Sequence, residues 1–228
     1  MDQAVSGQGT AAEETASQET ASQETAARET AGQGGVAVFD FDCTLTRVDS
    51  LLPWLRELAG PWRMAVALVP AAGAFLGAWG RGWGARRTAF KDALLVHVTR
   101  GRSVTSAQAA AERLGRHLRW LADQEDRFAA HRARGDFVVI ATGSPRLVVE
   151  ILTAERCRPD LLIGTELEVD EDQRLTGRML GGNCVREEKA RRVAALLARQ
   201  GPFRESHGYG NLPHDRLMLE LVDHAVVV

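Results

Sequence analysis

The sequence has little cysteine, little lysine and no marked excess of either charge. Cys43, Cys157 and Cys184 are too few and too scattered for a disulfide scaffold, and without a Cys-x-x-Cys pair a structural zinc site is not expected. His207 and His214 are also expected to be ordinary core or exposed histidines and not zinc ligands.

The charge and composition exclude further classes of protein. A formal net charge of −2 gives no electrostatic basis for nucleic-acid binding, so no nucleic-acid partner is expected. Of the 28 basic residues only Lys91 and Lys189 are lysines. With 228 residues, 45% hydrophobic and 25% charged, the chain has the profile of a soluble globular protein of one domain with an insertion, or of two small domains.

Residues 1–35 contain no aromatic side chain. A repeated unit begins in turn at Glu14, Glu19, Glu24 and Glu29, and its period of five residues matches neither a helix nor a strand. Such a segment buries too little apolar surface to offset its ordering entropy, so 1–35 is predicted to be a disordered, low-complexity tail. The start also lacks the basic and apolar regions of a signal peptide, and a cytoplasmic location is expected.

The remaining residues alternate between strand-like and helix-like patterns. Short apolar runs, which are typical of buried parallel strands, occur at residues 36–39, 137–141, 160–163 and 225–228. Helical apolar spacing occurs at 146–156 and 187–199, and a hairpin is predicted around the polar residues 170–173. Strands that alternate with helices predict a three-layer α/β domain with a parallel sheet, whose ligands bind at the carboxyl ends of the strands.

A long helical insertion separates the first two predicted strands. Helices are predicted at residues 51–58, 64–79 and 88–98, and from a start at Ser106 through 131. An insertion of this length at the active edge of a sheet is most simply a cap over the site. The predicted organisation is a helical cap over 49–134 and a catalytic core formed by 36–48 and 135–228.

Two aspartates, Asp40 and Asp42, directly follow the first predicted strand. Because they are two residues apart, they would share one side of the chain if the strand continued. Carboxylates held side by side repel each other, and a hard divalent cation is the usual means of neutralising them. The pair therefore favours a cation-dependent site over the simpler alternative of capping aspartates at a strand end.

Four segments with polar residues at strand and helix ends occur in order along the chain. They are Asp40-Phe-Asp-Cys-Thr-Leu-Thr, Ile140-Ala-Thr-Gly-Ser-Pro, Asn183-Cys-Val-Arg-Glu-Glu-Lys and residues 208–219. Together they resemble the four motifs of the haloacid dehalogenase (HAD) superfamily, in its phosphoserine-phosphatase-like branch, subfamily IB. The resemblance covers residues 36–228 and implies a Rossmann-like core with an inserted helical cap.

The resemblance implies a Mg²⁺-dependent phosphomonoester phosphatase that forms a phosphoaspartate. Asp40 would be the nucleophile, and Asp42 would act as general acid and then as general base. Thr142 and the backbone N–H of Gly143 would bind phosphate oxygens. Lys189 would neutralise charge on the phosphoryl group and on Asp40.

The resemblance also implies that Mg²⁺ binds Asp40, the backbone carbonyl of Asp42, Asn211 and Asp215. The family usually has an acid where this chain has Asn211, which removes one negative charge but keeps a carbonyl oxygen. The chain also ends at Val228, directly after the last predicted strand, whereas family members commonly continue further. Both departures keep a second hypothesis open: a catalytically weak or inactive binding or regulatory protein on the same scaffold.

Residues 64–80 form a run without charge between Arg63 and Arg81. As a helix it would be about 25 Å long, just short of the ~30 Å hydrocarbon core of a bilayer. Two alternatives are open: a buried cap helix, or an interfacial segment that makes peripheral membrane contact. The basic residues Arg81, Arg86, Arg87 and Lys91 would then face solvent or an anionic headgroup.

An apolar stretch followed by a basic cluster resembles the phosphatidylglycerophosphate phosphatases of this branch. The arginine helix of the phosphoserine enzymes does not align well onto residues 89–101, so phosphoserine is not favoured as the substrate. The expected partner is a phosphorylated small metabolite or the phosphate of a lipid headgroup. The sequence leaves the oligomeric state open.

Overall fold

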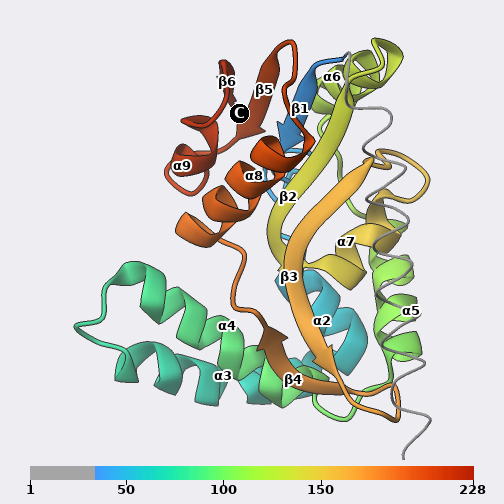
Figure 1. The fold of residues 1–228 in the computed structure, drawn as a ribbon. Helices are drawn as coiled ribbons and strands as arrows, with labels where there is room; N and C mark the ends of the chain where they lie inside the picture. Colours follow the sequence, from blue (N-terminus) through green and yellow to red (C-terminus); the bar gives the residue numbers. More distant parts are fainter. Residues whose placement is uncertain (1–33) are drawn as a thin grey trace, which may run out of the picture.

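The computed structural model describes residues 34–228, so the predicted tail over 1–35 lies outside the described residues apart from Gly34 and Gly35. Strands form a six-stranded sheet in the order β4-β3-β2-β1-β5-β6 (Figure 1). Their bounds are β1 (Val36–Phe39), β2 (Phe137–Pro145), β3 (Leu161–Val169), β4 (Leu175–Leu180), β5 (Ser206–Gly210) and β6 (His224–Val227). Strands β3, β2, β1, β5 and β6 pair in parallel, whereas β4 pairs antiparallel with β3.

Helices cover both faces of this sheet. Their bounds are α2 (Leu51–Ala59), α3 (Pro61–Gly77), α4 (Trp83–Thr99), α5 (Val104–Gly115), α6 (Ala122–Ala133), α7 (Arg146–Thr153), α8 (Glu187–Gln200) and α9 (Arg216–Leu219). Because side chains of a strand alternate, Val36 and Val38 of β1 pack with α8 and α9, and Ala37 and Phe39 pack in the larger core with α2, α5, α6 and α7. The predicted Rossmann-like, three-layer α/β fold is confirmed.

Two strands of the structure differ from the prediction. Strand β3 runs without interruption through both segments that were predicted separately, 160–163 and the first arm of the hairpin. Strand β5 was not predicted, because Ser-His-Gly-Tyr-Gly contains no apolar run. It is nevertheless paired on both sides, with β1 and β6, and its last three residues are buried. Neighbouring strands, not its own hydrophobicity, determine this element.

The prediction of continuous helix over 106–131 is wrong, because the structure divides this range into α5 and α6. The residue at the N-cap of α5 is Ser103 and not Ser106: the Ser103 Oγ accepts a hydrogen bond from the Ser106 backbone N at 3.2 Å. Between the two helices, Trp120 forms an isolated β-bridge with Thr46. This bridge ties the inserted helices to the loop that follows β1.

Helices α3 and α4 pack against each other at the carboxyl end of the sheet, and α4 also packs on β4 (Figure 1). Helix α6 instead lies against the sheet itself, where the ring centroid of Phe128 is 5.3 Å from that of Phe39. The division into a core and a cap over 49–134 stays a prediction. Within that range, α3 and α4 and the beginning of α2 border the carboxyl edge of the sheet.

Candidate active site

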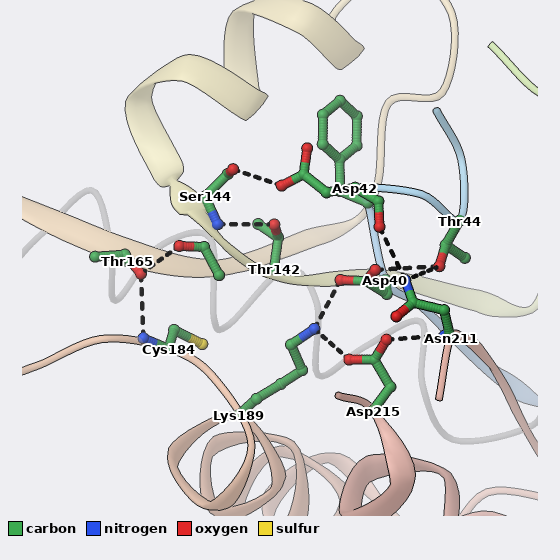
Figure 2. A network of polar contacts seen from close by, with 12 residues as sticks. Asp40, Asp42, Thr44, Thr142, Ser144, Thr165, Cys184, Lys189, Asn211 and Asp215 are labelled. Carbon is green, nitrogen blue, oxygen red and sulfur yellow. Dashed lines mark hydrogen bonds and ion pairs between the residues drawn. The ribbon is translucent and has the colours of Figure 1, made fainter. Parts of the chain in front are cut away.

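The predicted site residues lie at the carboxyl edge of the sheet, as parallel topology requires. Asp40 follows β1, Thr142 lies in β2, and Asn211 follows β5. Lys189 lies in the first turn of α8, and Asp215 precedes α9. Figure 2 shows that these side chains, from segments far apart in the sequence, turn toward one another.

Asp40 is buried, with 4% of its surface exposed. Its Oδ1 accepts a hydrogen bond from Lys189 Nζ at 2.7 Å, and its Oδ2 accepts one from Thr44 Oγ1 at 3.1 Å. Burial raises the pKa of Asp40 to about 6, although the charge of Lys189 acts in the opposite direction. Two donors therefore hold this carboxyl in one orientation.

Lys189 lies between two carboxylates. Its Nζ donates to Asp40 Oδ1 at 2.7 Å and to Asp215 Oδ1 at 2.6 Å, and all three side chains are buried. Burial by itself lowers the pKa of this ammonium, but the two neighbouring carboxylates raise it above its ordinary value. Lys189 is therefore a permanent cation. Its single positive charge lies beside two carboxylates, so the cluster of Asp40, Lys189 and Asp215 lacks one positive charge when both acids are ionised.

Asp42 lies in the turn after β1, and its carboxylate points away from Asp40 (Figure 2). The Asp42 Oδ2 accepts from Ser144 Oγ at 2.5 Å, and Oδ1 accepts from the Ser50 backbone N at 2.7 Å. Burial, and then the charges of Asp49 and Asp40, raise the pKa of Asp42 to about 7. Because β1 ends at Phe39, the two carboxylates do not share one side of a strand as the two-residue spacing predicted.

The carboxyl end of β2, where its pairing with β3 is irregular, presents Thr142 and Gly143 next to these acids. Thr142 is fully buried, and its Oγ1 accepts the Ser144 backbone N–H at 3.0 Å. The hydroxyl proton of Thr142 is therefore available for another acceptor. A Cβ at Gly143 would lie 2.7 Å from Val185 Cγ1, so only glycine fits this close approach.

The predicted magnesium ligands also meet. Asn211 Nδ2 donates to the backbone O of Asp42 at 3.1 Å, and the Asn211 backbone N donates to Asp215 Oδ2 at 2.9 Å. Carboxylate, amide and backbone oxygens are the donors that Mg²⁺ prefers, and the buried carboxylates of Asp40 and Asp215 share only one lysine. The residues present therefore fit a magnesium ion in chemistry and charge. In the structure, however, the amide nitrogen of Asn211, and not its oxygen, faces the Asp42 carbonyl.

Lys91 of α4 is a residue that the sequence analysis misplaced. The sequence predicts that Lys91 faces solvent or a headgroup together with the neighbouring arginines, but it is buried, with 8% of its surface exposed. Its Nζ donates to Gly143 O at 2.5 Å, Asn183 Oδ1 at 2.6 Å and Thr165 Oγ1 at 3.2 Å, and burial lowers its pKa to about 8. Lys91 thus joins α4 to the carboxyl end of β2 at Gly143. The rarity of lysine in this chain was the available signal.

A cavity of about 800 Å³ opens above the acids. Its floor is polar and includes Asp40, Asp42 and Lys189. On the side of α2, α3 and α4 it is lined by six apolar side chains, namely Leu51, Leu52, Ala72, Phe75, Leu76 and Phe90. Helix α4 also contributes the polar residues Arg87, Thr88 and Lys91 to the lining. A ligand that fills the cavity would have its polar end at the carboxyl edge of the sheet and its apolar part against these helices.

Comparison with known proteins relates this site to a family. The model of the family described as haloacid dehalogenase-like hydrolase matches residues 37–220. "Protein CicA" of Caulobacter vibrioides (strain NA1000 / CB15N) is 35% identical over 191 residues, which cover 82% of this chain and 83% of CicA.

Solved structures show the same fold. A protein with unknown function from Bordetella pertussis Tohama I has a TM-score of 0.69 at 24% identity, over 86% of this chain and 90% of that chain. A phospho-aspartyl intermediate analogue of phosphoserine phosphatase has a TM-score of 0.58 at 14% identity, over 86% of each chain. At these identities the likeness concerns the fold alone.

Proposed function

Because the chain belongs to the family of haloacid dehalogenase-like hydrolases, we propose that it is a Mg²⁺-dependent phosphomonoester phosphatase with Asp40 as nucleophile. The observation that carries the proposal is the buried Asp40 carboxyl, which Lys189 and Thr44 hold at the polar floor of the cavity. A cheap test is release of phosphate from p-nitrophenyl phosphate, with and without EDTA. We expect turnover that EDTA abolishes.

The residues support a two-step displacement. The Asp40 carboxylate attacks phosphorus, the bond from phosphorus to the leaving oxygen breaks, and Asp42 gives that oxygen a proton. Asp42 then takes a proton from water, whose oxygen attacks phosphorus and releases Asp40 and inorganic phosphate. Lys189, with the Thr142 hydroxyl and the Gly143 N–H, neutralises charge on the phosphoryl oxygens. Mg²⁺, bound by Asp40, the Asp42 carbonyl, Asn211 and Asp215, would supply further charge neutralisation.

One observation favours the alternative of a weak or inactive binding protein. The Asn211 amide nitrogen donates to the Asp42 carbonyl, an oxygen that is among the proposed metal ligands. A Mg²⁺ ion held by the Asp42 carbonyl would therefore compete with this N–H for the same oxygen. Phosphate and Mg²⁺ binding without any turnover of phosphate esters would favour this alternative over the phosphatase.

The Asn211→Asp variant tests this account of the metal site. We expect the Mg²⁺ concentration for half-maximal activity to fall about tenfold, because a carboxylate adds one negative charge and removes the N–H that competes for the Asp42 carbonyl. The measurement is phosphate release titrated with MgCl₂. Asn183→Asp adds the same charge elsewhere on the cavity wall and should not lower the Mg²⁺ requirement. If Asn211→Asp leaves the requirement unchanged, Asn211 is not a ligand.

The cavity favours a substrate whose phosphate is attached to an apolar body. Phe75, Leu76 and Phe90 form an apolar wall that would stay unused by a small charged metabolite. Removing such a wall from water is favourable at about 25 cal/mol per Å² of apolar surface. Of the two substrate classes predicted from the sequence, we therefore propose the phosphate of a lipid headgroup.

The outer side of α3 supports the same class of substrate. Trp62 and Val69 of α3 are 78% and 74% exposed, and Trp79, in the turn that follows α3, is 72% exposed. Arg63 and Arg81 lie at the two ends of the uncharged run. Leu76 lines the cavity and is also 59% exposed, so the apolar wall continues onto the molecular surface. We propose that this face lies on an anionic lipid surface.

In residues 34–228 no helix is long and apolar enough to cross a bilayer.

Vesicle binding tests the proposed contact. Val69→Ser together with Val66→Ser should reduce co-sedimentation with phosphatidylglycerol vesicles by about tenfold, because both apolar side chains are exposed on α3. Hydrolysis of p-nitrophenyl phosphate should stay unchanged. Leu180→Ser removes an equally exposed side chain at the end of β4 and is the control. If the double α3 variant, the Leu180→Ser control and the wild type bind vesicles equally, the proposed contact is wrong. If the wild type is a dimer and the double α3 variant is a monomer, this face instead binds a second copy of the chain.

A further inference from the structure

At the amino end of the sheet, remote from the cavity, three potential metal ligands lie together. Glu205 directly precedes β5, and His207 is its second residue. His224 begins β6, and in the parallel register of β5 and β6 it is the partner of His207. Residues two apart in an extended chain point to the same side, and register partners do so as well. Backbone pairing therefore brings the three side chains together.

The distances suit one metal ion. His207 Nε2 lies 3.4 Å from Glu205 Oε2, and His224 Nε2 lies 4.0 Å from the same oxygen. All three ligand atoms lie within 4.8 Å of one another. Ligand atoms of a tetrahedral zinc site, with bonds of about 2.0–2.1 Å, are separated by about 3.4 Å. One edge of the tetrahedron is already present, and the exposed ring of His224 needs to move by about 1 Å to complete the others.

The hydrogen bonds around these groups leave the right atoms available. Within residues 34–228, His207 Nε2 is a buried nitrogen that makes no well-formed hydrogen bond, and the Glu205 carboxylate lies 3.4 Å from it. Arg204 donates to Oε1 of Glu205 at 3.3 Å, which leaves Oε2 facing the two imidazoles. The ring of His207 also packs against that of His131, at 4.8 Å between centroids, and this contact limits its rotation. A metal ion bound between this nitrogen and the Glu205 carboxylate would satisfy both groups.

We propose that Glu205, His207 and His224 form a transition-metal site for Zn²⁺, with a water molecule as the fourth ligand. Two imidazoles and one carboxylate favour Zn²⁺ over Mg²⁺, whereas the acids near Asp40 have the opposite preference. The ion joins the edge strand β6 to β5, so it stabilises that edge of the sheet. His207 was expected to be an ordinary histidine; Glu205 is near it in sequence, and His224 becomes its neighbour only through the pairing of β5 with β6.

The test is Zn²⁺ binding to the untagged full chain in excess Mg²⁺, measured by calorimetry, with thermal unfolding in parallel. We expect one Zn²⁺ per chain and a higher Tm in the wild type. His224→Gln should weaken binding at least tenfold and remove the rise in Tm. His117→Gln is the matched control, because His117 Nε2 lies 3.9 Å from a single carboxylate, that of Glu57. It should bind Zn²⁺ as the wild type does.

A second measurement separates a ligand role from damage to the fold. Co²⁺ replaces Zn²⁺ at such sites and gives intense visible absorption when its coordination is tetrahedral. The wild type and His117→Gln should show these bands, and His207→Gln and Glu205→Gln should not. Zn²⁺ affinity and Co²⁺ spectra that are equal in the wild type and His224→Gln would overturn the proposal. Both readouts are independent of phosphatase activity, so a failure here is distinguishable from a failure of the proposed function.

Discussion

Asp40→Asn should abolish hydrolysis of p-nitrophenyl phosphate while the protein stays folded. Removal of a nucleophile that forms a covalent intermediate costs about 10⁵-fold or more in rate. The substitution changes one oxygen to nitrogen in a side chain that burial already disfavours as an anion, since the pKa of Asp40 is raised to about 6. We therefore expect the variant to unfold at the same temperature as the wild type, or at a higher one.

One measurement is the steady-state rate of phosphate release. The other mixes the enzyme with an ester whose phosphoryl group is labelled, quenches the reaction with acid and counts the label that stays on the protein. Label should be trapped on the wild type and not on Asp40→Asn. Asp49→Asn is the matched control, because Asp49 lines the same cavity but is exposed and makes no bond to Lys189 in the described residues. It should still trap label and hydrolyse the ester, although loss of its charge should lower the pKa of Asp42. Hydrolysis by Asp40→Asn at the rate of the wild type would refute the phosphoaspartate mechanism.

Lys189→Met should lose both activity and stability. The ammonium is the shared partner of Asp40 and Asp215, at 2.7 and 2.6 Å, so its removal leaves two buried carboxylates facing each other. Breaking a buried ion pair on one side costs about 3–5 kcal/mol in the free energy of unfolding. Loss of a positive charge that faces the phosphoryl group costs a further factor of about 10²–10³ in kcat.

Urea denaturation and kcat measured on the same samples test both effects. Added Mg²⁺ should raise the Tm of Lys189→Met more than that of the wild type, because the ion replaces part of the lost positive charge. Arg191→Met, on the exposed side of the same helix, is the control and should change neither quantity by much. If the free energy of unfolding of Lys189→Met equals that of the wild type, the ion pairs of Lys189 with Asp40 and Asp215 do not stabilise the fold.

Much of the fold follows from short-range patterns. The apolar runs at β1 and β2 predict buried strands because a strand covered on both faces has to be apolar throughout. The same argument misses β5, whose glycine-rich sequence is a strand only because β1 and β6 pair with it. It also merges α5 and α6, since the β-bridge of Trp120 to Thr46 that interrupts the helix joins residues distant in sequence.

The sequence by itself determined that Asp40 and Thr142 lie at the carboxyl edge of the sheet, because the apolar runs of β1 and β2 lead directly to them. Asn211 was assigned to the same site only through the resemblance of residues 208–219 to a family motif, since the strand before it was not predicted. Tertiary structure decided how their side chains are oriented and paired. Asp42 points to Ser144, and Asn211 turns its nitrogen to the Asp42 carbonyl. Such choices depend on competition between donors and acceptors that meet only after folding.

The same distinction explains Lys91 and the pair of His207 and His224. The rarity of lysine is visible in the sequence, but the burial of Lys91 depends on how α4 packs against the carboxyl end of β2 at Gly143. Two histidines separated by a helix have no recognisable spacing, and the register of β5 against β6 makes them neighbours. Local sequence determines elements and strand ends, whereas contacts between distant segments depend on packing of the whole chain, which no short pattern encodes.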